Sequence, residues 1–391
     1  MTNTSKIICY LSILLFTAVS TTSVAVPRIV PKAPSVAANG YILMDFDSGK
    51  IITEGNSQER LAPASLTKIM ASYAIFSELK QGNIQMSDEV TISEKAWRTG
   101  GSKMFIEVGK KIAVEDLLKG MIISSGNDAS VALAEYIGGA EETFAELMNQ
   151  YAEILGMKNS HFMNATGMPD EDHYTSAEDM AILSQALIRD FPEYYPLYSE
   201  KEFIYGKELK SGKPIKQSNR NKLLWRDESV DGLKTGYTEA AGYCLVSSAK
   251  RDDMRLISVV MKTESTETRA RETQKLLNFG FRFYETQTIT EPGETLSSPQ
   301  IWKGTQETIS AGVTEVLTIT LGRNQFRDLQ SEIILVDTII EAPVEQGTLL
   351  GTVIFSVDGK PVAETPLVAL ESVGEGDLWD SMVDAVKLWF Q

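Results

Sequence analysis

The sequence predicts a two-domain α/β protein, in which an antiparallel sheet with a helical cluster is followed by a small all-β domain. A length of 391 residues is enough for two domains of ordinary size. Apolar residues recur with helical spacing between residues 63 and 189, whereas they follow strand patterns in 230–262 and again in 286–373. A composition of 43% hydrophobic and 23% charged residues is typical of a globular chain.

The first 25 residues have the pattern of a signal peptide. Lys6 is their only charge, an apolar run extends over 7–19, and Ser23-Val24-Ala25 is a small-x-small cleavage site. The run is too short to span a bilayer comfortably, although a retained N-terminal anchor is the alternative interpretation. We therefore expect export, and a mature chain that opens with a lead-in over 26–39.

The composition of the mature chain narrows the classes of function. Export removes Cys9 and leaves Cys244 alone, so we expect no internal disulfide, which suits a domain of this size in a bacterial envelope. The formal net charge of −16 argues against a nucleic-acid partner. His161 and His173 are the only histidines, and no Cys/His cluster has zinc-ligand spacing. The sequence thus predicts chemistry without a metal or cofactor, and with little choice of imidazole base.

The elements of the first domain, predicted over 40–285, can be placed in order. A hairpin over 41–56 turns at Asp47-Ser48-Gly49, and helices follow from residue 63. A short loop at 124–127 separates two of these helices. The remaining elements are three strands and a closing helix: 231–238, 241–250, 254–262 and 269–285.

The second domain, predicted over 286–373, has alternating strand patterns. Its turns fall at Pro292-Gly293 and Asp358-Gly359, and it contains no constellation of catalytic residues. The final stretch, 374–391, is helical in pattern. One face of that stretch is apolar: Leu378, Trp379, Met382, Val383, Val386, Trp389 and Phe390. We expect this amphipathic helix to lie on a membrane surface; the alternative is a helix docked on the β-domain or on a second copy.

Ser65 and Lys68 stand in a place where sequence rules conflict. Lys68 lies in the first turn of a predicted helix, where the macrodipole favours an acidic residue. The helix continues with a nearly unbroken apolar run over 69–76, which predicts burial. Ser65 could be an N-cap, but a capping box would have Glu or Gln at position 68. A charge one turn from a hydroxyl in a buried helix indicates a functional site.

Two further motifs accompany this pair. Ser125-Gly126-Asn127 falls in the loop between two predicted helices, and Lys234-Thr235-Gly236 falls in a predicted strand. Taken alone, the first is compatible with an ordinary N-cap loop, and the second with an edge strand protected by a lysine. The three motifs together, in this order and far apart in the sequence, favour a common catalytic site.

These motifs resemble the S-x-x-K, S-x-N and K-T-G elements of the penicillin-binding protein and serine β-lactamase superfamily. Within it, the chain is most similar to the D-alanyl-D-alanine carboxypeptidases of low molecular mass. The segments that carry this resemblance are "PASLTKIM", "SSGNDASVALAEY", "NRNKLLW" and "VDGLKTGYTEAAGYCLV". The resemblance implies a β-lactamase-like transpeptidase fold over 40–285, and the signal peptide, β-domain and terminal helix match the layout of that family.

The chemistry can also be argued from the residues. The hydroxyl of Ser65 needs a base, and Lys68 is the nearest candidate. Free lysine has a pKa of about 10.4. Burial and the nearby cation Lys234 would both lower the pKa of Lys68 below that value.

We expect Ser125 to relay a proton to the leaving amine and Asn127 to hold the substrate amide. Gly236 would admit an extended peptide to the strand edge. By resemblance, the backbone N–H groups of Ser65 and Tyr237 form the oxyanion hole.

A peptide that ends in a free carboxylate requires a cationic or hydroxyl partner. Thr235 is suited to this, and the resemblance assigns the carboxylate to Arg269, although Arg271 is close in sequence. Arg220 matches a family position near the site; a solvated surface arginine is the alternative.

The resemblance implies acyl transfer through Ser65, with peptidoglycan stem peptides ending in D-Ala-D-Ala as substrates and β-lactams as covalent inhibitors. We find no glutamate placed to drive deacylation as in class A β-lactamases; Glu146 and Asn149 have the wrong spacing. A carboxypeptidase on the periplasmic face of the bacterial inner membrane is therefore favoured over a β-lactamase. A D,D-endopeptidase and a catalytically silent wall-binding protein remain alternatives.

Overall fold

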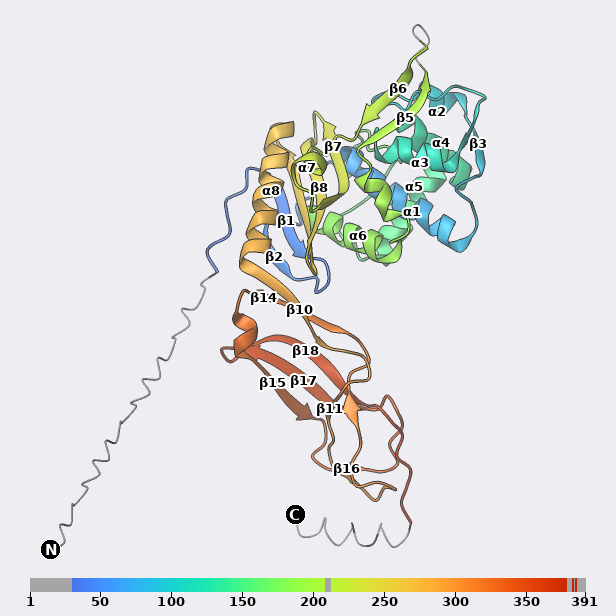
Figure 1. The fold of residues 1–391 in the computed structure, drawn as a ribbon. Helices are drawn as coiled ribbons and strands as arrows, with labels where there is room; N and C mark the ends of the chain where they lie inside the picture. Colours follow the sequence, from blue (N-terminus) through green and yellow to red (C-terminus); the bar gives the residue numbers. More distant parts are fainter. Residues whose placement is uncertain (1–29, 208–211, 378–381, 383, 385–391) are drawn as a thin grey trace, which may run out of the picture.

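The computed structural model describes residues 30–207 and 212–377, together with Met382 and Asp384. The predicted signal peptide, and all of the predicted terminal helix from residue 378 except these two residues, lie outside the described residues. The molecule is elongated, with an α/β part at one end and a β part at the other (Figure 1).

A five-stranded antiparallel sheet forms the centre of the α/β part, with the strand order β2-β1-β9-β8-β7. Its strands are β1 Gly40–Asp45, β2 Ile51–Gly55, β7 Val230–Thr238, β8 Gly242–Arg251 and β9 Met254–Thr263. The predicted hairpin and the three predicted strands are all present. β7, which carries the Lys-Thr-Gly motif, is at an edge of this sheet and pairs only with β8.

Helices cover both faces of the sheet (Figure 1). α8 Thr266–Phe283 lies on one face, where Leu276 and Leu277 belong to the same apolar cluster as Leu43 and Leu256 of the strands. The helical cluster lies on the other face and contains most of the core. Its elements are η1 Ala64–Leu66, α1 Thr67–Gln81, α2 Glu94–Arg98, α3 Val114–Ile122, α4 Asn127–Gly138, α5 Glu141–Ile154, α6 Ala177–Asp190 and η2 Tyr195–Ser199. The short helix α7 Leu223–Arg226 lies beside α8 instead, and its Leu223 and Leu224 belong to the α8 apolar cluster.

α1 is buried on most of its sides, as its apolar sequence predicts. Two small two-stranded antiparallel sheets flank the cluster. They are β3 Glu89–Thr91 with β4 Lys111–Ala113, and β5 Glu202–Lys207 with β6 Pro214–Ser218.

The β part begins where α8 ends at Phe283, two residues before the end predicted for this helix. β10 Tyr284–Thr290 pairs with β14 Leu317–Gly322, and a second five-stranded sheet has the order β11-β13-β18-β17-β15. The other elements are β11 Thr295–Ser297, β12 Ile301–Trp302, β13 Ala311–Gly312, η3 Gln325–Asp328, β15 Leu329–Leu335, β16 Ile340–Glu341, β17 Leu349–Val357 and β18 Lys360–Ala369. Apolar side chains from most of these strands form a separate core.

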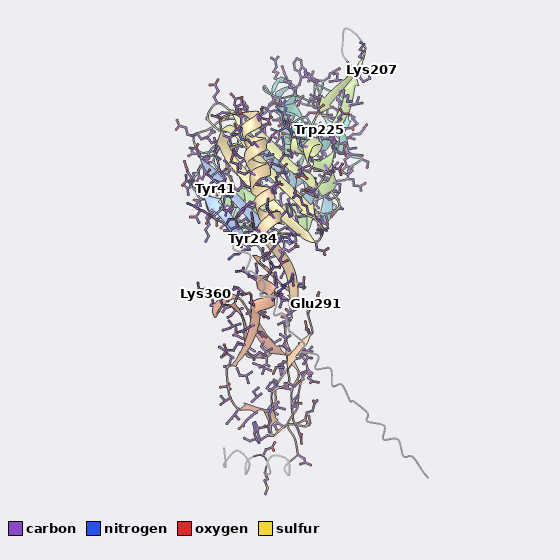
Figure 2. The ribbon with its side chains drawn as sticks, turned by 60° about the vertical axis from the view of Figure 1, so that its left-hand side comes forward. Tyr41, Lys207, Trp225, Tyr284, Glu291 and Lys360 are labelled. Atoms are coloured by element: carbon purple, nitrogen blue, oxygen red, sulfur yellow. The ribbon has the colours of Figure 1, made fainter. Side chains whose placement is uncertain are left out.

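Hydrogen bonds between side chains connect the two parts next to Tyr284 (Figure 2). Thr286 Oγ1 donates to Asp45 Oδ2 at 2.7 Å, and the hydroxyls of Ser48 and Thr320 are 2.6 Å apart. Asp45 is fully buried, so this contact is shielded from solvent. Among the described residues, no helix combines the length and the apolar content needed to cross a bilayer.

Candidate active site

Ser65 lies in the tight turn that precedes α1. The turn is a 3-10 helix, and Ala64 adopts φ = 48°, a left-handed conformation that is uncommon for a residue with a side chain. Gly167 packs against this turn so closely that a Cβ atom there would be 1.8 Å from the Ala64 carbonyl oxygen. The Ser65 side chain is half-buried. The backbone strain at Ala64 is of the kind that functional sites retain.

Lys68, one turn further along, is fully buried. Its Nζ is 2.8 Å from Asn127 Oδ1 and 2.6 Å from the Thr166 carbonyl oxygen, and 3.3 Å from Ser65 Oγ. The first two partners can only accept hydrogen bonds, whereas the serine hydroxyl can also donate. In a neutral amine, the two N–H bonds are therefore used by the carbonyl oxygens, and the lone pair is left to face Ser65.

The electrostatic environment favours this neutral form. Burial, followed by the positive charge of Arg220, lowers the pKa of Lys68 to about 7; Asp128 and Glu141 act in the opposite direction. Within the described part of the chain, no carboxylate forms an ion pair with Lys68. A lysine with such a pKa is partly deprotonated at neutral pH and can act as a base.

Ser125 and Lys234 form a second hydroxyl–amine pair. Ser125 lies between α3 and α4 with φ = 59°, and Lys234 Nζ is 3.0 Å from its Oγ. Burial lowers the pKa of Lys234 well below its usual value, and the charges of Lys68, Arg220 and Arg269 lower it further. The charge of Lys68 thus acts on Lys234, whereas the cation that lowers the pKa of Lys68 is Arg220.

A single pocket brings together most of the residues predicted from the sequence. Its predicted members are Ser65, Ser125, Arg220, Thr235, Gly236, Tyr237 and Arg269. Three further members were not predicted: Ser102, Tyr243 and Thr266. Lys68, Asn127 and Lys234 do not line the pocket and are buried.

Two residues that were predicted to face substrate also have close neighbours within the protein. The Asn127 side chain, expected to face substrate, is nearly buried, accepts from Lys68, and donates through Nδ2 to the Gly100 carbonyl oxygen at 2.8 Å. Its amide is therefore engaged at both ends within the protein. Gly236 lies against the Ser65 turn, where a Cβ atom would be 2.9 Å from the Pro63 carbonyl oxygen. Glycine at 236 allows the edge strand to approach the Ser65 turn.

The arginines are clearly distinguished by their positions. Arg269 is buried at the pocket, where its Nη1 donates to the Gly236 carbonyl oxygen at 3.0 Å. Burial is the first cause that lowers its pKa to about 10. Arg271 instead points to another surface and pairs with Glu272. Arg220 lines the pocket, and burial lowers its pKa.

The residues that sequence reasoning missed gave weak local signals. Tyr243 stacks on Tyr237 with ring centroids 4.3 Å apart, and it follows the Lys-Thr-Gly strand across a tight turn. Thr166 contributes only its backbone carbonyl, which no side-chain motif can reveal. Ser102 is brought to the site by a long loop after α2. Cross-strand pairing could have identified Tyr243, because Tyr237 and Tyr243 are register partners in a predicted hairpin.

No group of three or more His, Cys, Asp or Glu side chains among the described residues is arranged to hold a metal ion. What the pocket does contain is a concentration of positive charge and hydroxyl groups around one nucleophilic serine. This combination is suited to acyl transfer on a substrate that carries a carboxylate.

Comparison with known families agrees with this geometry. Residues 28–265 match the family described as D-alanyl-D-alanine carboxypeptidase, Peptidase_S11. The chain belongs to this family. Residues 284–375 match a second family, the C-terminal domain of penicillin-binding protein 5.

Named relatives in this family resemble the chain over most of its length. The D-alanyl-D-alanine carboxypeptidase DacC of Escherichia coli is 43% identical over 370 residues, which is 92% of this chain and 91% of that protein. The structure of penicillin binding protein 5 from Haemophilus influenzae is 42% identical, with a TM-score of 0.83, and covers 89% of this chain and 100% of that one. Penicillin-binding protein D2 from Listeria monocytogenes, solved in an ampicillin-bound form, is 27% identical with a TM-score of 0.57 over 64% of this chain and 100% of that chain. The predicted fold class, a β-lactamase-like domain followed by a β-domain, is confirmed; the terminal helix is not part of that confirmation.

Proposed function

We propose that this protein is a serine D-Ala-D-Ala carboxypeptidase that removes the terminal D-alanine from peptidoglycan stem pentapeptides. The observation that carries the proposal is the environment of Lys68. Its amine is buried without a carboxylate, and two carbonyl oxygens direct its lone pair to Ser65 Oγ. Membership of the carboxypeptidase family supports the choice of substrate.

In the acylation step, Lys68 removes the Ser65 proton as Oγ attacks the carbonyl carbon of the penultimate D-alanine. The negative charge on the carbonyl oxygen is stabilised by the backbone N–H groups of Ser65 and Tyr237. The C–N bond then breaks, and the leaving amine of D-alanine must receive a proton. Ser125, hydrogen-bonded to Lys234, supplies it and is reprotonated from the lysines.

The substrate carboxylate binds at the Thr235 and Arg269 side of the pocket. Thr235 contributes a hydroxyl, and Arg269 a guanidinium that is held by the carbonyl oxygen of Gly236. Arg220 is close enough to lower the pKa of both lysines, so it keeps the bases neutral and also adds positive charge for an anionic substrate. Asn127 orients Lys68 in the free enzyme.

Hydrolysis of the acyl-enzyme completes the reaction and restores Ser65. After acylation by the peptide, D-alanine leaves and water can take its place. A β-lactam acyl group retains its leaving group, which blocks that access, so β-lactams are expected to acylate Ser65 and to be released slowly. The ampicillin-bound relative supports binding of β-lactams at this pocket.

We also propose that the chain keeps the domain organisation predicted from its sequence. This comprises a signal peptide over 1–25, a lead-in over 26–39, the catalytic domain over 40–285, the β-domain over 286–373 and a terminal helix over 374–391. The change from α8 to β10 and the two family matches support the division between the domains.

We further propose that the protein is exported to the periplasm and that its terminal helix attaches to the outer face of the inner membrane. The two described residues of this segment support the orientation of such a helix. Asp384, on its polar side, accepts a hydrogen bond from the Lys303 backbone N–H at 2.9 Å. Met382, on its apolar side, is 62% exposed.

The proposed function is tested by D-alanine release and by labelling with benzylpenicillin. The mature protein should release D-alanine from a pentapeptide ending in D-Ala-D-Ala, and mass spectrometry should locate one penicilloyl adduct on Ser65. Ser65→Ala should lose both. An undiminished adduct in that variant, or no D-alanine release by the wild type, contradicts the proposal. Cross-linked muropeptides are assayed in parallel, and faster cleavage of them than of the pentapeptide would indicate an endopeptidase.

A further inference from the structure

The loop that follows α5 provides one of the two carbonyl oxygens that orient Lys68. Its ends are joined by backbone hydrogen bonds between His161 and Tyr174, and Thr175 pairs with Leu61 just before the Ser65 turn. The loop is thereby fixed to the chain that carries the nucleophile. Its inner residue Thr166 is buried and presents the carbonyl that accepts from Lys68.

Asn164 shapes the backbone around that carbonyl. Its Oδ1 accepts hydrogen bonds from the backbone N–H groups of Thr166, Gly167 and Met168 at 3.1, 2.8 and 3.2 Å, and from the Thr166 hydroxyl at 2.8 Å. These contacts hold the loop in one compact conformation. They do not by themselves determine where the loop lies relative to α1.

Several contacts place the loop, and His173 adds a direct side-chain hydrogen bond to α1. It is 3% exposed; its Nε2 is 2.8 Å from the hydroxyl of Thr67, the residue before Lys68. Its Nδ1 accepts from the Met163 backbone N–H at 3.3 Å. Because Nδ1 is an acceptor, Nε2 carries the proton in the neutral ring and donates to Thr67. Burial lowers the pKa of His173 to about 4, so the ring is neutral under working conditions.

We propose that His173 is a positioning residue for the reaction, which holds the loop against α1 and thereby keeps the Thr166 carbonyl on Lys68. This inference rests on the proposed acylation of Ser65 by β-lactams and peptides. His173 does not touch substrate or move a proton. If it is lost, the carbonyl can withdraw and the amine of Lys68 is free to rotate, so its lone pair no longer faces Ser65.

The test compares two substitutions of His173 in the full mature protein. His173→Gln can reproduce both hydrogen bonds, because its amide nitrogen donates to Thr67 and its oxygen accepts from Met163. His173→Leu removes both and keeps an apolar volume. His161→Gln is the matched control. The side chain of His161 contacts the Asp172 carbonyl oxygen and the Tyr174 ring, both within the same loop.

The readout is acylation by a chromogenic β-lactam, separated into the dissociation constant of the initial complex and the first-order acylation constant. His173→Leu should lower the acylation constant about 10- to 100-fold, the size expected for a misplacement of about 1 Å, and leave the dissociation constant within about twofold. His173→Gln and His161→Gln should resemble the wild type. Thr67→Val, which removes the partner hydroxyl, should reproduce the defect and show no additional loss when combined with His173→Leu.

The outcomes separate this inference from the proposed function. A wild type that is not acylated overturns both. An acylated wild type with an unchanged acylation constant in His173→Leu and Thr67→Val overturns the positioning role alone. If His173→Leu does not fold, Thr67→Val decides, because it keeps the shape of the buried side chain. Equal loss in the dissociation and acylation constants also contradicts the proposal.

Discussion

The catalytic domain and the β-domain bury their side chains in different ways. Around Ser65, the interior contains the charged side chains of Lys68, Lys234 and Arg269, and the non-glycine residues Ala64 and Ser125 have positive φ. In the described β-domain, the buried polar side chains are two threonines, at 290 and 320, and no charged side chain is buried. Positive φ at non-glycine residues also occurs in the β-domain, at Lys303, Asn324 and Asp358, so the two described regions differ in their buried charges.

The catalytic domain buries charged groups that its function needs, although such burial is unfavourable. An ionised group in an apolar interior is unfavourable, so a buried lysine without a carboxylate tends to be neutral. The β-domain needs no such group, and its core can be purely apolar. We therefore expect substitutions at the buried cations to lower catalytic activity strongly. Changes at the far end of the β-domain should instead affect attachment of the protein to membranes.

The largest effect is expected for Lys68→Arg. Arginine keeps the positive charge but does not deprotonate in proteins, so it cannot serve as the base. Acylation of Ser65 by benzylpenicillin should fall by about 10²- to 10⁴-fold, the usual contribution of a general base. Rapid-quench mass spectrometry measures the rate, and circular dichroism checks that the variant is folded. Retention of most of the wild-type rate by a folded variant would sink the assignment of the base.

A smaller effect is expected for Arg269→Ala. Loss of a charged hydrogen-bond donor to the substrate carboxylate should raise KM for a D-Ala-D-Ala peptide by about 10- to 100-fold. Arg271→Ala is the control, because Arg271 is two residues away but pairs with Glu272 at a different surface, and its KM should stay within about twofold. Steady-state assays of D-alanine release measure both. The opposite ranking of the two variants would transfer the carboxylate site to Arg271.

The smallest effect on chemistry is expected from shortening the chain after Gly374. Activity on small soluble peptides should stay within about twofold of the wild type. The strand β7, which carries Thr235 and Gly236 of the pocket, lies in the α/β part, at the other end of the molecule from β16 (Figure 1). The shortened protein should remain in the supernatant with lipid vesicles, whereas the intact mature form should sediment with them even in high salt. An intact protein that salt alone releases would argue against hydrophobic attachment.

Much of the fold could be predicted because the local patterns agree with it. Alternating residues in 231–262 predict the strands β7, β8 and β9, and the apolar run after Lys68 predicts the buried α1. The Ser65–Lys68 pair was recognisable because Lys68 lies in the first turn of a helix, where an acidic residue is favoured. The pairing order of the strands and the attachment of the β-domain through Asp45 and Thr286 depend on long-range contacts that no local pattern contains.

The parts of the site that escaped prediction are those that depend on backbone geometry. The Thr166 carbonyl reaches Lys68 across 98 positions in the sequence, and any residue type could supply it. Gly236 was identified from its motif, but its close approach to Pro63 could be found only in the structure. His173 received no role from the sequence, and its hydrogen bond to Thr67 of α1 could be found only in the structure.

The dependence of Ser65 acylation on pH tests the central claim that Lys68 is the base and is neutral at working pH. Because burial and Arg220 lower the pKa of Lys68 to about 7, the neutral fraction and the acylation rate should rise through that region and level off by about pH 8.5. The inflection belongs to the coupled Lys68–Lys234 pair. In Arg220→Gln, loss of the positive charge should move it to higher pH. A wild-type rate that is flat between pH 5.5 and 9, or that continues to rise toward the pKa of free lysine, would contradict the account.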